Sequence, residues 1–268
     1  MPTYVPIWGC NLGDTLWVTP LARYIPFGEM MVQMLGHDAR SRATAPILDG
    51  LCPVEWVEKT EETPKFPFRG HVTQRILAAY GFRDKPSIPR VVMRPDEIQW
   101  AIEYLRGLGC GAHTIAITNH NSGSGDPTNY RAHYVRPPSN VIKTLARFWM
   151  AAGYKVVQFG PAPTFHDKDP FDPIPNAIQV RGLSVRQLAA CYHVIGRFIG
   201  GDSGDYHLML AVGGKVACLV PSHNEQLGYY HWDLLYDDVC WGSERPRVHY
   251  VLHEKWDRLM NTKLFDEI

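Results

Sequence analysis

Long hydrophobic runs are missing from this sequence of 268 residues. No apolar run approaches the roughly 18 residues that a membrane-spanning helix needs. The start of the chain has neither the basic residues nor the continuous apolar segment of a secretory signal. We therefore expect a chain with no transmembrane segment that works in the cytoplasm. Peripheral attachment at the inner face of the membrane stays open.

The sequence also lacks an excess of charge of either sign. It carries 27 Lys and Arg against 27 Asp and Glu, and 20% of its residues are charged. Proteins that hold nucleic acid by bulk charge need many surplus basic side chains, so this class is disfavoured, although a local basic patch stays open. Proline and glycine are spread through the chain without low-complexity linkers, which indicates a turn-rich globular protein of one large or two small domains.

Patterns typical of disulfide frameworks and metal sites are absent as well. The 6 cysteines form no C-x-x-C pair, and most of them stand in apolar stretches such as "KVACLV" and "LAACYHV". This usage favours buried free thiols in a reducing compartment over a disulfide framework. His249 and His253 are spaced like neighbours on a helix, but "HEKWD" lacks the second histidine of a zinc-protease motif. We expect no metal site.

What is present is an alternation of strand and helix patterns. Residues 3–25 indicate a short strand, a glycine turn and a helix bent at Pro20. Pro95 opens a helix that ends at Gly109, and the buried-strand pattern "HTIAITNH" follows it. Ser184 and Gln187 form a capping box. Further strands are predicted at 30–35, 54–57, 155–159, 177–180, 197–201 and 216–221, and further helices at 72–80, 141–152, 185–195 and 206–212.

Strands that alternate with helices at this spacing predict parallel sheets covered on both faces. We place a domain boundary near residues 106–112. The predicted fold is α/β, with two Rossmann-like, doubly wound parallel-sheet domains facing a cleft, one of residues 1–110 and one of residues 111–268. In such folds ligands bind at the carboxyl ends of the strands.

Two strand-to-helix junctions place a carboxylate beside glycine at the start of a helix. Asp14 follows Gly13 at the first junction, and the second junction reads "GGDSGDYH" from residue 200. A helix N-terminus has unpaired N–H groups and partial positive charge, so it binds phosphate when glycine lets the ligand approach. The alternative is that Asp14 and Asp202 are ordinary helix N-caps.

The segments "LGDTLWVTPLARYI" and "SVRQLAACYHVIGRFIGGDSGDYHLMLAVGGKVACLVP" together resemble the heptosyltransferase family of bacterial glycosyltransferases. The resemblance covers most of residues 8–228 in the family's order. It implies the GT-B fold, with an acceptor-side N-terminal domain and a nucleotide-sugar-binding C-terminal domain. The matching residues are Gly13, Asp14, Thr19, Pro20 and Arg23 near the start, and Asp202, Ser203, Gly204 and His207 at the second junction.

The resemblance implies an inverting, metal-independent hexosyl- or heptosyltransferase. Its substrate is a nucleotide-diphosphate-sugar donor, and no other cofactor is implied. Asp14 corresponds to the general base that takes the proton of the acceptor hydroxyl. The residues implied to bind the donor are Gly13, Ser122, Gly123, Ser124, Arg131, Gly182, Leu183, Asp202, Ser203, Gly204 and His207.

Roles within this set differ. Asp202, Ser203, Gly204 and His207 correspond to the diphosphate and sugar cluster, and "NHNSGSGDPTNYR" corresponds to a phosphate loop. Gly182 and Leu183 correspond to a turn at the nucleobase. Arg131 stands near the place of a lysine that the family uses for the diphosphate, and a solvent-facing arginine is the alternative.

Several alternatives stay open. A nucleotide-sugar epimerase or hydrolase uses the same fold without an acceptor, and a catalytically silent nucleotide-binding module keeps the fold without chemistry. A glycan, a lipid-linked sugar and a modified DNA base are all open as acceptors. The segment "PAPTFHDKDPFDPIP" departs from the family pattern, so donor specificity is not transferred. The nucleotide, the sugar and the oligomeric state stay open too.

Overall fold

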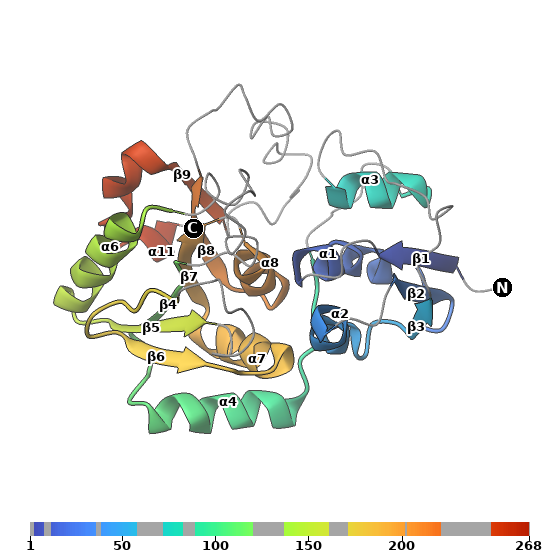
Figure 1. The fold of residues 1–268 in the computed structure, drawn as a ribbon, viewed down its shortest axis with the longest axis horizontal. Coiled ribbons are helices and arrows are strands. Elements are labelled where there is room, and N and C mark those ends of the chain that lie inside the picture. The colour runs from blue at the N-terminus through green and yellow to red at the C-terminus, as the bar shows by residue number, and fades with distance from the viewer. Residues whose placement is uncertain are drawn as a thin grey trace. The chain divides into compact units, whose positions relative to one another are not determined.

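The structure is a computed structural model that describes residues 3–7, 12–35, 39–57, 72–82, 89–119, 137–160, 171–201, 203–220 and 248–267. Their contacts divide them into two compact units (Figure 1). The described residues up to Val92 belong to the first unit, and those from Met93 onward belong to the second.

The first unit is built on a small parallel sheet. Its strands are β1 (Thr3–Ile7), β2 (Met30–Leu35) and β3 (Val54–Val57), in the order β1-β2-β3. Buried Val5, Val32 and Met34 come from the strands, and Leu16 and Leu48 come from the helical segments. Those segments are α1 (Leu12–Trp17), η1 (Thr19–Arg23), α2 (Ala39–Thr44), η2 (Ala45–Leu48) and α3 (Val72–Ala79).

Pro20 breaks the first predicted helix and does not merely bend it. The α-helix α1 ends at Trp17, and a 3-10 helix runs over Thr19–Arg23 with proline in its first turn. Proline has no N–H to donate to the preceding turn, so it suits the start of a new helical segment. Thr19 fixes the junction, because its hydroxyl donates to the carbonyl of Leu16 at 2.7 Å and accepts the Arg90 N–H at 2.8 Å.

The second unit contains a sheet of six parallel strands. They are β4 (Thr114–Ile117), β5 (Lys155–Gly160), β6 (Ile178–Arg181), β7 (Arg197–Gly201), β8 (Lys215–Val220) and β9 (Val248–Leu252). Their order is β6-β5-β4-β7-β8-β9, and every neighbouring pair is parallel. The chain winds outward from β4 in one direction and from β7 in the other, which is the doubly wound arrangement. The predicted α/β fold class with two parallel sheets is confirmed.

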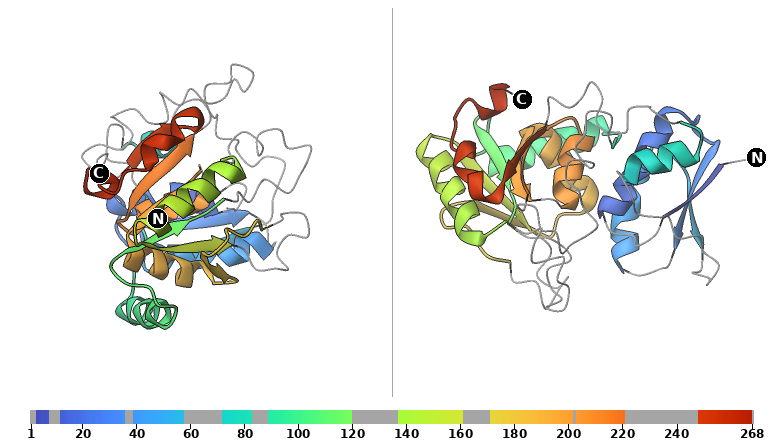
Figure 2. Two further views of the ribbon diagram at one scale, coloured as in Figure 1. Left: turned by 90° about the vertical axis from the view of Figure 1, so that its left-hand side faces the viewer. Right: turned by 90° about the horizontal axis from the view of Figure 1, so that it is seen from above.

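Helices cover both faces of this sheet (Figure 2). On one face α6 (Ser139–Ala151), η5 (His253–Leu259) and α11 (Leu264–Glu267) bury side chains against Ile117 and Ile199. On the other face lie α7 (Val185–Ile195) and α8 (Gly204–Ala211), where Tyr192 packs on Phe159 and Phe198. The predicted strand at 113–120 is thus β4, which is buried along its whole length.

Helix α4 (Pro95–Gly107) belongs with the second unit, although the boundary predicted near residue 110 placed it in the first domain. It lies on the outer side of α7 (Figures 1 and 2). Arg186 at the start of α7 forms a bidentate ion pair with Glu97, and the Nε of Arg186 donates to Glu97 Oε1 at 2.8 Å. This contact, made across 89 residues of sequence, joins α4 to the helix beside it.

The capping box of α7 is confirmed, since Ser184 Oγ accepts the Gln187 N–H at 3.2 Å and Gln187 Oε1 accepts the Ser184 N–H at 2.9 Å. Sequence patterns missed α2, β9 and the helical segments after β9. Among the described cysteines, Cys52, Cys110 and Cys191 are free thiols. No described helix is long and apolar enough to span a membrane.

Candidate nucleotide-binding site

The carboxyl ends of β4 and β7 mark the point where the winding of the six-stranded sheet reverses. The two strands are neighbours, yet the next strand along the chain lies to opposite sides of them. At such a point the connecting segments diverge and leave a crevice at the sheet edge, which is where open α/β sheets bind ligands. Thr118 and Asn119 follow β4, and Ser203 and Gly204 follow β7 at the start of α8.

Helix α8 begins at this edge with its N-terminus. Ser203 is the N-cap residue, with extended backbone at φ −149° and ψ 168°, and its side chain makes no capping hydrogen bond. Within the described part of the chain, Ser203 Oγ is buried and has no hydrogen-bond partner. A serine that leaves its capping role unused at the start of a helix has its hydroxyl available to a bound group.

His207 stands one turn further along α8. It is 7% exposed, and its ring lies 4.0 Å from that of Tyr206 between centroids. The His207 N–H donates to the Ser203 carbonyl at 3.4 Å, so the two residues lie one above the other on the helix. The predicted donor-binding residues Ser203, Gly204 and His207 are therefore brought together in the first turn of α8.

Thr118 is a candidate that sequence patterns missed. It is 1% exposed, and its backbone N–H donates to the Ile199 carbonyl at 3.2 Å, which ties it to β7. Among the described residues, Thr118 Oγ1 is a second buried hydroxyl oxygen without a hydrogen-bond partner. A buried polar group left unpaired costs about 1–3 kcal/mol, so two of them on neighbouring strand ends call for a functional reason.

The absence of a side chain at Gly200 leaves space for the Thr118 side chain. A Cβ at this position would lie 2.7 Å from the ring of Phe198 and 3.0 Å from Thr118 Oγ1. Any larger residue would push on the sheet beside the site. The glycine before the "GDSGD" segment is thus required by close packing at the end of β7.

A hydrogen bond from α7 also fixes the start of helix α8. Tyr192 on α7 is fully buried, and its hydroxyl donates to Asp205 Oδ1 at 2.8 Å. Burial and the neighbouring Asp205 carboxylate raise the pKa of Tyr192 well above its ordinary value, so it stays a neutral donor. The bond holds the Asp205 carboxylate against α7, at the helix end where a negative charge is favourable.

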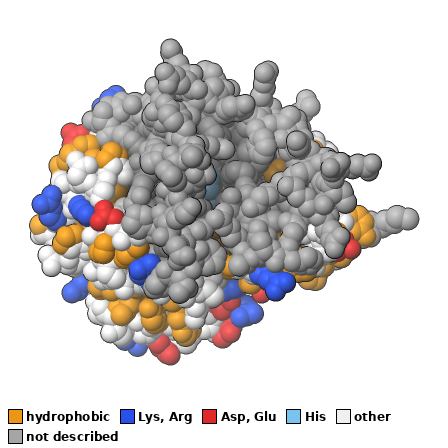
Figure 3. All heavy atoms as spheres, viewed as in Figure 1, with side chains coloured by type: hydrophobic (Ala, Val, Ile, Leu, Met, Phe, Trp, Pro, Cys, Tyr) orange, Lys and Arg blue, Asp and Glu red, His pale blue; other side chains and the backbone are white. Residues whose placement is uncertain are grey.

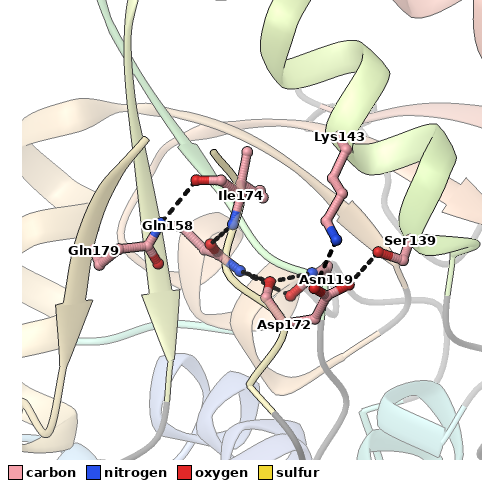
Figure 4. A network of polar contacts seen from close by, with 7 residues as sticks. All are labelled: Asn119, Ser139, Lys143, Gln158, Asp172, Ile174 and Gln179. Atoms are coloured by element: carbon pink, nitrogen blue, oxygen red, sulfur yellow. Dashed lines mark hydrogen bonds and ion pairs between the residues drawn. The ribbon is translucent and has the colours of Figure 1, made fainter. Parts of the chain in front are cut away.

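A polar network lies next to the end of β4 (Figure 4). Gln158 in the middle of β5 is fully buried, and its Nε2 donates to Asn119 Oδ1 and to the Asp172 carbonyl, both at 2.9 Å. Its Oε1 accepts the Ile174 N–H at 2.7 Å. Asn119 Nδ2 donates to the same Asp172 carbonyl at 2.8 Å. The residue that follows Thr118 is therefore held in one position.

Gly182 and Leu183 lie at the far end of the same sheet edge. They form the turn between β6 and α7, where Gly182 adopts a left-handed φ of +78° that favours glycine. Gly182 is exposed and Leu183 is half-buried. Three strand spacings separate β6 from β7 in the sheet order, so the end of β6 lies about 14 Å from the end of β7.

In the first unit, the backbones of Gly13 and Asp14 lie in α1. The helix is anchored by Thr15, whose Oγ1 donates to Thr44 Oγ1 at 3.2 Å in the buried interior. The side chain of Asp14 lies outside the description, as do Asp202 and the four predicted loop residues Ser122, Gly123, Ser124 and Arg131. Their predicted roles stay predictions.

Metal ligands do not gather in the described residues. No group of three or more His, Cys, Asp and Glu side chains there is placed to hold a metal ion. His249 lies in strand β9 and His253 in the 3-10 segment after it, so they do not share a helix. On the face drawn in Figure 3, the described Lys and Arg side chains lie among Asp and Glu and form no field of one sign.

Solved structures share this fold. The chain is similar to the glycosyl transferase family 9 protein of Veillonella parvula DSM 2008, with a TM-score of 0.62 and 14% identity over 93% of this chain and 85% of that one. It is also similar to the Escherichia coli ADP-heptose lps heptosyltransferase II, with a TM-score of 0.55 and 12% identity over 97% of this chain and 96% of that one.

A third similar structure is the iron-containing dodecameric glycosyltransferase TibC of enterotoxigenic Escherichia coli H10407. Its TM-score is 0.54, with 13% identity over 82% of this chain and 58% of that one. Neither a protein-family model nor a curated protein matches the sequence. At these identities the likeness concerns the fold. The chain has the two-sheet α/β fold of the heptosyltransferase-like, GT-B glycosyltransferases.

Proposed function

We propose that this protein is an inverting, metal-independent glycosyltransferase that moves a sugar from a nucleotide-diphosphate-sugar to an acceptor hydroxyl. The observation that carries the proposal is the edge where β4 meets β7. There the N-terminus of α8 and the buried hydroxyls of Ser203 and Thr118 share one end of a doubly wound sheet. The fold shared with glycosyltransferases supports the same reaction class.

In this proposal the first turn of α8 binds the diphosphate of the donor. The N–H groups at the helix start and the Ser203 hydroxyl donate to phosphate oxygens, and His207 donates to the diphosphate or the sugar. When the bond to the sugar breaks, negative charge grows on the departing diphosphate. Donors that are already fixed in place stabilise that charge without reorganising, and one such donor contributes about 100- to 1,000-fold to the rate. Asp202, Ser122, Gly123, Ser124 and Arg131 are proposed to complete the phosphate contacts, and Gly13 is proposed as a further donor-binding residue.

Asp14 is proposed as the general base. Its carboxylate takes the proton of the acceptor hydroxyl while that oxygen attacks the anomeric carbon from the face opposite the diphosphate. The new carbon–oxygen bond forms as the bond to the diphosphate breaks, and the nucleoside diphosphate leaves with the electron pair. The configuration at the anomeric carbon is inverted. Base assistance of this kind contributes about 100- to 10,000-fold.

The first experiment identifies the donor. The purified protein is heated with ADP-, GDP-, UDP- and CMP-linked compounds, because a ligand that binds only the folded state raises the apparent stability. An ADP-linked sugar is the first to try, since ADP-heptose is named for one structural neighbour. If none of these compounds binds, the proposed glycosyltransferase function is refuted. The alternative of a catalytically silent nucleotide-binding module is then refuted too.

The second experiment tests the chemistry. With a bound donor and candidate acceptors, Asp14→Asn should lower turnover at least about 100-fold while donor binding stays within about twofold. Asp49→Asn is the control, because Asp49 is an exposed carboxylate in the same unit. A changed sugar or free nucleotide in the absence of acceptor would instead indicate an epimerase or a hydrolase. Normal turnover of Asp14→Asn would exclude Asp14 as the base.

We further propose that the reaction takes place in the cytoplasm. The acceptor is open among a glycan, a lipid-linked sugar and a modified DNA base. Thin-layer or mass-spectrometric detection of labelled sugar on each acceptor class decides between them. A product that appears only with a lipid-linked acceptor would favour work at the inner face of the membrane.

A further inference from the structure

A stacked arginine lies at the carboxyl ends of β5 and β6. Gly160 and Arg181 are the last residues of these strands, and they are partners in the sheet register. The ring of Phe171 covers Gly160 so closely that a Cβ there would lie 2.3 Å from it. The guanidinium carbon of Arg181 lies 4.4 Å from the centroid of the same ring, which is cation–π geometry.

Phe171 is held in place through its neighbour Asp172. The Asp172 carbonyl accepts the hydrogen bonds of Asn119 and Gln158, at 2.8 and 2.9 Å. Its carboxylate accepts from the Ser139 hydroxyl and forms an ion pair of 2.6 Å with Lys143, both on α6 (Figure 4). Contacts from the end of β4, from β5 and from α6 thus fix the backbone beside the ring. This Phe171–Arg181 platform is already fixed in position, so it loses little entropy when a ligand binds to it.

The position of the platform suits the nucleoside end of a nucleotide. Strands β6 and β7 are three spacings apart in the sheet order. At about 4.8 Å per spacing this separation is about 14 Å, a length that an extended nucleoside diphosphate spans. In doubly wound sheets the nucleotide runs from the switch point across the carboxyl ends of the neighbouring strands. With the diphosphate at α8, the base reaches the end of β6.

We propose that Arg181, stacked on Phe171, binds the nucleobase of the donor by stacking on it. This inference rests on the proposed function and adds a residue to its donor site. Arg181 is exposed, whereas Phe171 beneath it is half-buried. A guanidinium is planar and stacks on aromatic faces, which a lysine ammonium does not do. Gly182 follows Arg181 at φ +78° and adds no side chain beside it.

The test separates a base contact from a phosphate contact. Wild-type protein is titrated by calorimetry with ADP, GDP, UDP and CMP, and the tightest binder is then compared with inorganic pyrophosphate on Arg181→Lys and Phe171→Leu. Lysine keeps the positive charge but loses the plane. Arg147→Lys is the control, because Arg147 is exposed on α6 and donates to Thr144 at 3.0 Å. Unfolding temperatures verify that each variant is folded.

We expect Arg181→Lys and Phe171→Leu to weaken nucleotide binding about five- to tenfold and to leave pyrophosphate binding within about twofold. Arg147→Lys should bind both ligands like the wild type. Equal weakening of nucleotide and pyrophosphate would show a phosphate contact and overturn the inference, and so would unchanged nucleotide binding. If the wild type binds none of the four nucleotides, the proposed function fails, and this inference fails with it.

Discussion

Gln158 is the residue whose loss should disturb the second unit most specifically. It is fully buried in the middle of β5, and its amide makes three hydrogen bonds, of 2.7, 2.9 and 2.9 Å (Figure 4). Gln158→Met keeps the length and flexibility of the side chain but removes all three. The Ile174 N–H, in a residue that is 1% exposed, would lose the acceptor that the amide gives it.

The cost follows from these contacts. A buried N–H left without an acceptor costs about 1–3 kcal/mol, and each of the two other hydrogen bonds contributes about 0.5–1.5 kcal/mol. The sum is about 2–6 kcal/mol of unfolding free energy. For a unit of this size such a loss lowers the unfolding temperature by at least about 4 °C.

Urea unfolding followed by circular dichroism, together with calorimetry, measures the loss. Gln99→Met is the matched control, because Gln99 lies on the outer helix α4 and its hydrogen bond to Glu103 is exposed. The control should stay within about 0.5 kcal/mol of the wild type. If Gln158→Met also stays within that range, the network does not stabilise the edge of the sheet and does not fix the backbone beside Phe171.

Three further predictions concern charge, thiols and metal. Burial would raise the pKa of Glu97, but its hydrogen bonds and the charges of Arg186 and Arg94 outweigh burial and lower it. Glu97→Gln should therefore cost about 1.5–3 kcal/mol at pH 7, a difference that disappears as the pH falls below about 4, whereas exposed Glu103→Gln should show neither effect in urea titrations. Burial raises the pKa of the Cys52 and Cys191 thiols to about 12, so mass spectrometry should find both unlabelled by iodoacetamide at pH 8 until urea unfolds the protein. Treatment with EDTA should leave the transfer rate unchanged, and a loss that added iron restores would contradict metal independence.

Sequence patterns predicted the elements that local rules define. The strand β4 is buried at every position and reads as a continuous apolar run, and the capping box of α7 needs only Ser184 and Gln187. The boundary between the two units could not be predicted from local patterns. Pro95 and Gly109 mark the ends of α4 clearly, but only its contact with α7, through Arg186 and Glu97, assigns it to the second unit.

In the candidate site, too, sequence patterns found some residues and missed others. The glycines and Ser203 stand out in sequence because they occupy a strand-to-helix junction. Thr118 gives no such signal, since its significance depends on the neighbouring β7 and on the space that Gly200 leaves. Gln158 did carry a signal, as a polar residue within the apolar run "KVVQFG". Its partners, 14–39 residues away in sequence, could not be read from it.

The first turn of α8 is proposed to hold the diphosphate of a nucleotide-sugar donor. The most direct measurement is a crystal structure of the protein with the nucleoside diphosphate that binds most tightly in the titrations. We expect phosphate oxygens within hydrogen-bond distance of the α8 N-terminal N–H groups and Ser203 Oγ. A nucleotide bound elsewhere, with α8 and Thr118 untouched, would contradict this proposal.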